Sequence, residues 1–470
     1  MHFLLISGSP VKGIAITPLS NEGSGERHQT VPNYTMRPKG AEVKVGVFPY
    51  IPGCPGIIDE RADQRGRGFR SRVIWRLLAC GLKRIWYKKG KHLAPKITFR
   101  EVFRRRITPA TVTATVVCAL GLAFNIWFAV LNKTGWGVDF NQFYAASRLT
   151  GKCHLYDWDA LRKMEAENGL EVPVGRLPVV LYGYKILGSL PYAVARPIWM
   201  AGSIAALVFF AACWPSTRRW LMAVALACSM PATLVVLFGQ DVPFWLMFFT
   251  AGLLLMERKR PWSAGVAFSL CICKFHLALG IPVMLAAQRR CRTWIAAAIA
   301  GVGLIASCFL IEGPEWPFRY AKMSHMPAFS PALERMPNLY GIASWLPWTA
   351  ATEVVGAVAI VLLLWAVCRG GTDLGTAGAA AAACGLLLGH HAYAGDCALL
   401  IPLSVLTLQR QGAPPWLKVW AVVVLSPVPV LLLVSQKPFL GQMLIAAFVV
   451  TAIVAGRAQP LNRTAPAPAA

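Results

Sequence analysis

Long apolar runs dominate the chain from about residue 107 to residue 455. A lipid-embedded backbone must satisfy its own hydrogen bonds, so apolar runs near the ~20 residues that cross a bilayer predict transmembrane α-helices. The first predicted span is 108–131. The later runs lie at about 174–190, 192–213, 219–238, 242–256, 262–287, 294–311, 351–368, 374–390, 396–409, 415–434 and 438–455. We therefore expect an all-α polytopic membrane protein with ten to thirteen transmembrane helices.

One run, 262–287, has basic clusters at both ends, at Glu257–Arg260 and at Arg289–Arg292. Basic residues beside apolar spans favour the cytoplasmic side of the membrane. Two cytoplasmic ends on one run predict a broken or re-entrant helix, which is tolerated where protein or a water-filled cavity surrounds it.

The segments between the runs set the expected topology. Arg104, Arg105 and Arg106 precede the first span, so the N-terminus is predicted to be cytoplasmic. Residues 132–172 then lie outside, with stretches around Phe143 and Leu161 that suit interfacial helices. A second long loop, Glu312–Thr349, could cover a site on that face.

Composition supports a membrane domain at 107–456. Of the 470 residues, 56% are hydrophobic and 14% are charged, against roughly 25% charged in soluble domains. The N-terminal 1–106 is basic and rich in Gly and Pro, which predicts a largely disordered cytoplasmic extension, and 457–470 is predicted to be a disordered tail.

Charge and cysteine usage exclude several classes of protein. The net charge of +26 is concentrated in residues 60–106 and beside the spans, where it favours anionic lipid headgroups over nucleic acid. The 13 cysteines show neither metal spacing nor a disulfide framework. The chain lacks a P-loop, a dinucleotide fingerprint and a G-x-S-x-G motif, the usual signatures of ATP-driven transport, dinucleotide binding and serine hydrolysis. We expect no metal and no cofactor.

Asp139 is the leading candidate for chemistry. It lies a few residues beyond the first span, in Gly135–Phe140, where a partly desolvated carboxylate would have a raised pKa suited to proton abstraction. A solvated loop acid or a helix N-cap explains the same position equally well.

Two further candidates lie inside the apolar run 262–287. Lys274 and His276 stand where an ionisable side chain costs about 2.5–3.5 kcal/mol to insert and usually marks a polar cavity. A cation there could hold a phosphate; the alternative is snorkelling towards an interface.

Polar groups also interrupt the apolar pattern at two other places in the chain. His390, His391, Tyr393 and Asp396 separate two apolar segments and could bind a sugar hydroxyl or orient a base, unless they form an ordinary loop. Gln240 and Asp241 follow Gly239 at a helix break lined by polar groups, for which a plain turn is the alternative.

These residues lie in a series of motifs that resembles glycosyltransferase family 87, the polyprenol-phosphate-mannose-dependent mannosyltransferases of the GT-C superfamily. The resemblance covers about residues 107–455. Its motifs are Asp139-Phe140-x-x-Phe143-Tyr144-x-Ala146, Gly151, Leu155-Tyr156-Asp157, Leu177-Pro178, Leu190-Pro191, Ala195–Trp199, Gly239-Gln240, Ala264-Gly265, Lys274-Phe275-His276 and Asp396. Phe275 stands where the family usually has Pro, and Pro178 stands alone where a pair is common.

The resemblance implies a GT-C bundle in a bacterial-type plasma membrane, with its active site facing the exterior. A hexose, mannose in that family, would move with inversion from polyprenyl phosphate to a glycolipid or polysaccharide. Asp139 would be the general base, and Lys274, His276 and Gln240 would bind the donor phosphate. Acceptor or sugar contacts are predicted for Tyr144, Tyr156, His391, Tyr393 and Asp396.

Two other classes remain open. A transporter or lipid flippase would use the intramembrane Lys, His and Asp as a pathway, although the chain lacks the pair of similar halves typical of many transporters. A non-catalytic scaffold for polysaccharide assembly would tolerate replacement of Asp139.

Overall fold

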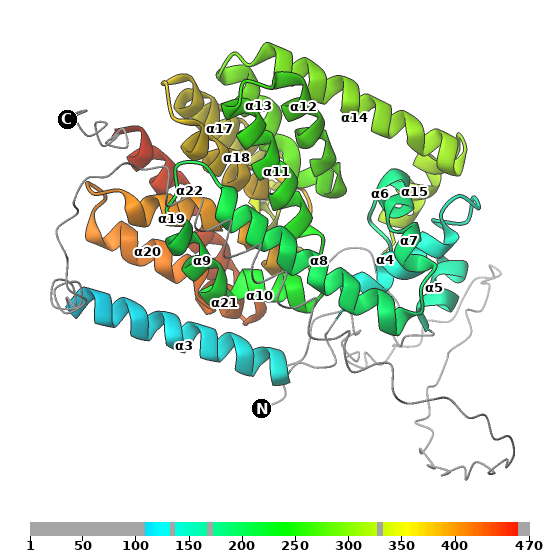
Figure 1. The fold of residues 1–470 in the computed structure, drawn as a ribbon, viewed down its shortest axis with the longest axis horizontal. Coiled ribbons are helices and arrows are strands. Elements are labelled where there is room, and N and C mark those ends of the chain that lie inside the picture. Colours follow the sequence, from blue (N-terminus) through cyan, green and yellow to red (C-terminus); the bar gives the residue numbers. More distant parts are fainter. Residues whose placement is uncertain (1–108, 132–136, 167–172, 327–331, 459–470) are drawn as a thin grey trace, which may run out of the picture. The chain divides into compact units, whose positions relative to one another are not determined.

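The computed structural model describes residues 109–131, 137–166, 173–326 and 332–458, and every regular element in these ranges is a helix (Figure 1). The predicted extension 1–106 and residues 459–470 of the predicted tail lie outside these ranges. The helices, numbered as in Figure 1, are α3 (Pro109–Leu131), α4 (Val138–Leu149), α5 (Trp158–Ala166), α6 (Pro178–Gly183), α7 (Lys185–Gly188), α8 (Tyr192–Cys213), α9 (Arg219–Cys228), α10 (Met230–Leu237), α11 (Val242–Glu257), α12 (Pro261–Ser269), η2 (Leu270–Leu279), α13 (Gly280–Ala287), α14 (Cys291–Glu312), α15 (Trp316–Ser324), η4 (Leu333–Arg335), α16 (Leu339–Ala343), α17 (Thr349–Arg369), α18 (Leu374–Leu388), η5 (Ala394–Leu400), α19 (Ile401–Gln409), α20 (Pro415–Leu425), α21 (Val428–Val434) and α22 (Pro438–Ala458).

The predicted apolar runs correspond closely to these helices. Within the described residues, five helical segments are long and apolar enough to cross a membrane, the kinked segment Pro261–Ala287 among them, or up to seven if each bent pair counts as one span. The bent pairs are α9 with α10, at 67°, and α20 with α21, at 58°. Four shorter apolar helices accompany them, and the higher count of ten to thirteen spans stays a prediction. The structure is thus an all-helical bundle with several membrane-length helices.

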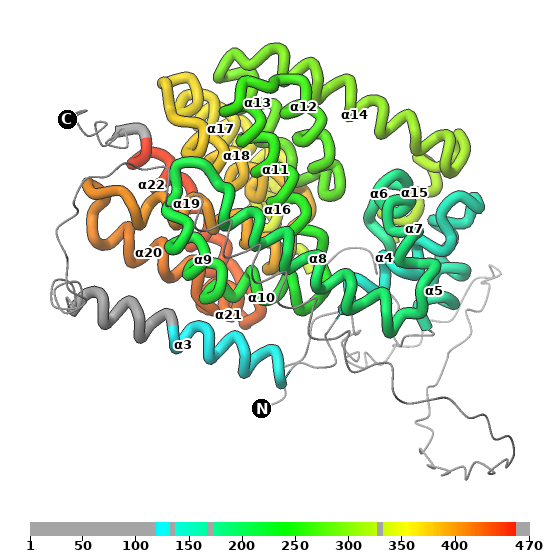
Figure 2. The backbone as a smooth tube through the Cα atoms, in the orientation of Figure 1, coloured from blue at the N-terminus to red at the C-terminus, as the bar shows by residue number. Residues whose placement is uncertain are grey.

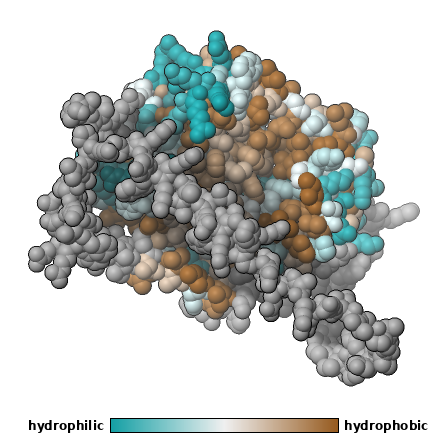
Figure 3. Space-filling view, viewed as in Figure 1, coloured by the Kyte–Doolittle hydropathy of each residue, from teal (hydrophilic) through white to brown (hydrophobic). Residues whose placement is uncertain are grey.

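Apolar side chains cover much of the described surface that is visible in Figure 3. Exposed examples on long helices include Ile299 and Val302 of α14 and Val355 of α17, which are 61–69% exposed. Apolar contact with water on this scale is unfavourable, whereas contact with lipid tails is not. This surface is what membrane-embedded helices require.

The run at 174–190 forms two short helices, α6 and α7, instead of one long one. Gly183 ends α6, and Lys185 begins α7. Both pack against α4 at one end of the described unit, together with α5 and α15 (Figure 2). A second core of buried side chains, separate from that of the main bundle, holds these helices together.

The run at 262–287 folds back on itself, as its two basic flanks predict. It comprises α12, η2 and α13, and Lys274 breaks it with non-helical dihedrals (φ −132°, ψ 71°). At the far end, Gln288 donates to the carbonyl oxygen of Thr372, at 3.3 Å. At the near end, Glu257 lies close enough to Asp373 to sense its charge. A straight helix of 27 residues would be about 40 Å long and could not bring both ends to Thr372 and Asp373. The segment is therefore a hairpin with Lys274 near its tip.

Small residues allow this hairpin to approach α18 closely. Gly280 lies against the backbone of Ala381, and Gly385 lies against the carbonyl oxygen of Leu277. A Cβ atom at either glycine would collide with backbone. Close backbone packing of this kind is typical of helix pairs in membranes, and here it fixes the height of Lys274 in the bundle.

The basic loops gather at one end of the bundle. Helix α11 ends at the Glu257–Arg260 cluster and α14 begins at the Arg289–Arg292 cluster, whereas their opposite ends lie at Asp241 and Glu312. Glu312 accepts a hydrogen bond from the backbone N–H of Gly151, so the far end of α14 reaches the α4–α7 group. The bundle therefore has a basic end and, opposite it, an end that carries the small helices; we call the second the small-helix end.

Candidate active site

The first turn of α4 rests directly on the end of α10. The backbone N–H of Gly137 donates to the carbonyl oxygen of Leu237, at 2.8 Å, and that of Asp139 donates to Phe238, at 2.9 Å. Unpaired N–H groups at a helix start need such acceptors, and the end of α10 provides them. Asp139 is thereby fixed beside the turn that follows α10.

That turn depends on Gly239, which has the left-handed dihedral φ +73° that glycine adopts at low cost. A Cβ atom there would lie 2.7 Å from the Cβ of Phe140. The Gly239 carbonyl oxygen also accepts a hydrogen bond of 2.8 Å from the indole of Trp199. Only glycine fits this position, and its turn places Gln240 next to Asp139.

Asp139 itself is partly buried, and its carboxyl group is hydrogen-bonded to the side chain of Gln240. Desolvation by the surrounding protein raises the pKa of the Asp139 carboxyl. The hydrogen bond with Gln240 opposes that rise, as do the positive charges of Lys274 and Arg176. A carboxylate that is more basic than usual, on a half-buried residue, is a chemically competent proton acceptor.

Behind Asp139 lies a chain of buried charges. Arg176 forms a bidentate pair with Asp241, with Nε–Oδ2 and Nη2–Oδ1 distances of 2.6 and 3.0 Å. Lys274 lies 3.8 Å from Asp241 and donates a hydrogen bond to Asp396. The side chains of Lys274, Asp241 and Asp396 are at most 1% exposed. Two cations and two carboxylates thus balance one another inside the protein, as buried charges require.

Lys274 owes its place in this chain to the hairpin tip, where the helix is interrupted. Asp396 uses its other oxygen to accept the backbone N–H of Tyr393, at 2.8 Å, and so caps the start of η5. The Lys274 ammonium group also lies over the Tyr393 ring, 6.0 Å from its centre. Lys274 is enclosed and paired in this structure, and its predicted contact with a phosphate stays a prediction.

The histidines lie beside this pair. The rings of His276 and His391 are 6.4 Å apart, and His391 Nε2 is 3.5 Å from the Tyr393 hydroxyl. Desolvation lowers the pKa of His391 to about 4, so its imidazole is neutral at pH 7. Two buried polar atoms here, Gln240 Oε1 and His276 Nε2, have no hydrogen-bond partner in the described structure. Buried polar atoms are seldom left unpaired, so both are candidates to meet a ligand.

Two tyrosines named from the motifs have their hydroxyls engaged with backbone. Tyr144 donates to the carbonyl oxygen of Leu190, at 2.7 Å, and Tyr156 donates to that of Arg176, at 2.8 Å. Both rings are buried in the core of the small helices. In this structure they position other residues, and their predicted sugar contacts stay predictions.

The structure therefore brings together residues from five segments, which we call the polar cluster: Asp139, Arg176, Gln240, Asp241, Lys274, His276, His391, Tyr393 and Asp396. Sequence reasoning missed Arg176 as a site residue because it lies at the start of an apolar run. It placed Asp241 at a polar helix break without a role. The sequence signal that could have found them is a charged residue at the start of an apolar segment, positive for Arg176 and negative for Asp241.

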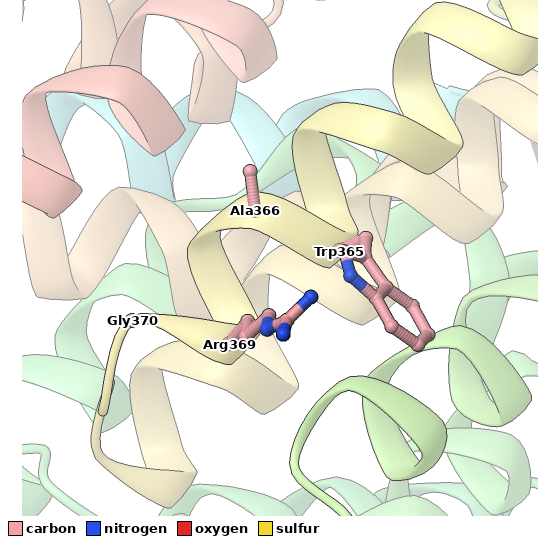
Figure 4. A pocket seen from close by; sticks show the side chains of 4 residues that line it. All are labelled: Trp365, Ala366, Arg369 and Gly370. Atoms are coloured by element: carbon pink, nitrogen blue, oxygen red, sulfur yellow. The ribbon is translucent and has the colours of Figure 1, made fainter.

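Within the described residues, no group of three or more His, Cys, Asp or Glu side chains is arranged to hold a metal ion. An open recess lies elsewhere, on the last turn of α17, where Trp365, Ala366, Arg369 and Gly370 line it (Figure 4). It shares no residue with the polar cluster. We therefore define the candidate site by the contacts within the cluster.

Residues 178–394 match the model of glycosyltransferase family 87. The matched segment includes Gln240, Lys274 and His391, while Asp139 precedes it and Asp396 follows it closely. No curated protein and no solved structure matches the chain. The family match and the membrane-length helices together indicate a membrane glycosyltransferase.

Proposed function

We propose that this protein transfers a hexose, mannose in the first instance, from a polyprenyl-phosphate donor to a glycolipid or polysaccharide acceptor, with inversion at the anomeric carbon. The observation that carries the proposal is the position of Asp139. The desolvated carboxylate of this half-buried residue lies beside Gln240 and near the buried cations Arg176 and Lys274, next to a segment that matches a glycosyltransferase family.

In the proposed step, the acceptor hydroxyl loses its proton to the Asp139 carboxylate and its oxygen bonds to the anomeric carbon. The bond from that carbon to the phosphate oxygen breaks, and the polyprenyl phosphate leaves with the electron pair. Positive charge near the leaving oxygen stabilises it. Lys274 is the proposed source of that charge. The unpaired Nε2 of His276 and Oε1 of Gln240 are the proposed partners for the donor.

We propose that the small-helix end faces the exterior of a bacterial-type plasma membrane. The basic loops cluster at the opposite end, and such loops favour the cytoplasm. This places the N-terminus of α3 in the cytoplasm and the polar cluster within reach of lipid-linked sugars in the outer leaflet.

The direct test is transfer by the purified protein in lipid nanodiscs, with polyprenyl-phosphate-mannose and a panel of glycolipid acceptors. We expect Asp139→Asn and Asp139→Ala to lose about a hundredfold or more in rate, the usual contribution of a general base. Asp157→Asn is the matched control, because Asp157 is an exposed acid that caps α5. Equal release of polyprenyl phosphate by wild type and both Asp139 variants would reject the assigned base. In sealed proteoliposomes, movement of the lipid across the bilayer without its hydrolysis would favour a flippase.

Two native cysteines test the orientation. Cys153 is exposed beside α5, and Cys291 is exposed within the Arg289–Arg292 cluster. In intact cells, a membrane-impermeant maleimide should modify Cys153 and spare Cys291, as read from peptide masses. The reverse pattern would overturn the proposed sidedness.

A further inference from the structure

The pair formed by Arg176 and Asp241 has no part in the chemistry proposed above, yet it is the best-defined ion pair in the polar cluster. Its two contacts, at 2.6 and 3.0 Å, have the parallel geometry of a strong guanidinium–carboxylate pair. The Asp241 side chain is fully buried, and that of Arg176 is 12% exposed. Burial of both charges is costly unless each serves the other, so the pair needs an explanation beyond surface solubility.

Asp241 gives up a local interaction to form this pair. It is the N-cap residue of α11, a position where an aspartate normally accepts a backbone N–H of the first turn, but its side chain makes no such bond. Its oxygens instead face Arg176 and Lys274. The side chain is thus held by partners distant in sequence, at the loss of the capping hydrogen bond.

Arg176 is held equally firmly from its own side. Its carbonyl oxygen accepts the Tyr156 hydroxyl, and its guanidinium lies 5.1 Å from the centre of the Phe143 ring. Desolvation works against its charge, yet Asp241 keeps the pKa of Arg176 above the ordinary value. The pair therefore ties the small helices, which carry Asp139, to the first turn of α11.

Several charged or titratable groups surround Asp139. They are Arg176 ahead of α6, Asp241 at the start of α11, Lys274 in η2 and Tyr393 ahead of η5, with Arg196 of α8 against the neighbouring Gly137. The backbone N–H of Asp139 donates to Phe238, at 2.9 Å, and its carboxyl meets Gln240, the chain neighbour of Asp241. We propose that the Arg176–Asp241 pair is a positioning element that holds the small helices, and Asp139 with them, against the first turn of α11. This inference rests on the function proposed above.

The two members of the pair act on Asp139 in opposite directions. The positive charge of Arg176 lowers the pKa of Asp139, and the negative charge of Asp241 raises it. Activity that needs ionised Asp139 is lost as the pH falls through its pKa. Removing Arg176 should therefore move the acidic limb of the activity profile to higher pH, and removing Asp241 should move it to lower pH.

The experiment measures kcat/KM for mannose transfer against pH for wild type, Arg176→Gln, Asp241→Asn and the double variant. We expect shifts of the acidic limb of about half to one pH unit in opposite directions for the two single variants. The double variant should shift less than either. The limb position is read within each profile, so it does not depend on how much of a variant is folded.

Arg319→Gln is the matched control, since Arg319 forms a 2.7 Å pair with Glu315 on α15 and is far more exposed. Its limb should coincide with that of wild type. Suppose that the wild type transfers the sugar. If neither single variant then moves the acidic limb, or both move it in the same direction, the positioning role is wrong while the proposed function stands. If wild type neither transfers the sugar nor hydrolyses the donor, the proposed function itself fails.

Discussion

Replacement of Asp396 by alanine tests the buried charge chain most directly. In the wild-type structure, Lys274 donates to Asp396, and the two side chains are 1% and 0% exposed. Asp396→Ala leaves the ammonium group of Lys274 in the protein interior with Asp241, at 3.8 Å, as its nearest carboxylate.

The expected loss of stability follows from these contacts. Removing one member of a buried ion pair costs about 3–5 kcal/mol, and the remaining carboxylate of Asp241 places this case near the lower figure. The backbone N–H of Tyr393 also loses its acceptor, which adds about 1 kcal/mol. We therefore expect Asp396→Ala to lower the free energy of unfolding by about 4 kcal/mol.

Removing both charges should be less harmful than removing one. The double variant Lys274→Met/Asp396→Ala has no unpaired ammonium group, so we expect it to be more stable than Asp396→Ala by about 2 kcal/mol. The assay is reversible unfolding in mixed micelles with rising SDS content, followed by tryptophan fluorescence.

The control for this assay is Glu315→Ala, which removes a surface pair with Arg319 in which the Glu315 side chain is 71% exposed. Its cost should be less than about 1 kcal/mol. The reasoning fails if Asp396→Ala unfolds at the same SDS content as Glu315→Ala. It also fails if the double variant loses as much stability as the single variants Asp396→Ala and Lys274→Met lose together.

Three more predictions concern the surroundings of Asp139. Gly239→Ala should lose most transfer activity and about 2 kcal/mol or more of stability, because its Cβ would collide with α4 in addition to the left-handed strain. The control Gly371→Ala has a similar φ of +76° but open space around it, so unfolding in micelles should show a loss of only about 1 kcal/mol. Tyr156→Phe removes a hydrogen bond to Arg176 and should lower stability by about 1 kcal/mol with an unchanged KM for the acceptor; a large rise in KM would instead support a sugar contact. Burial lowers the pKa of His391 to about 4, so as the pH falls the imidazole is protonated in the unfolded chain before it is in the folded protein. The stability of the wild type should therefore drop between about pH 6.5 and pH 4. In the same assay, the stability of His391→Gln should drop less over that window.

Sequence patterns located the apolar helical segments because membrane helices are specified locally. A helix in lipid satisfies its backbone within itself, so apolar length alone identifies segments such as 192–213 and 438–455, which match α8 and α22 within a few residues. The hairpin at 262–287 was also predictable, since its two basic flanks are read directly from the chain. The run at 174–190 was not, because its division into α6 and α7 depends on packing against α4.

The composition of the polar cluster was decided by tertiary structure. Lys274 and Asp396 were each visible as ionisable residues in apolar surroundings, but they are 122 residues apart and nothing local shows that they pair. Arg176 and Asp241 are 65 residues apart, and their contact depends on how the small helices rest on the turn at Gly239.

Hydrophobic length and flanking charge, both properties of short stretches of chain, thus established a helical membrane protein and singled out Asp139. The depth and rotation of each helix depend on contacts between segments, such as Gly280 against Ala381. Those contacts determine which buried charges meet. Because a buried charge is stable only with a partner, the fold and not the sequence pattern assigned Lys274 to Asp396 and Arg176 to Asp241.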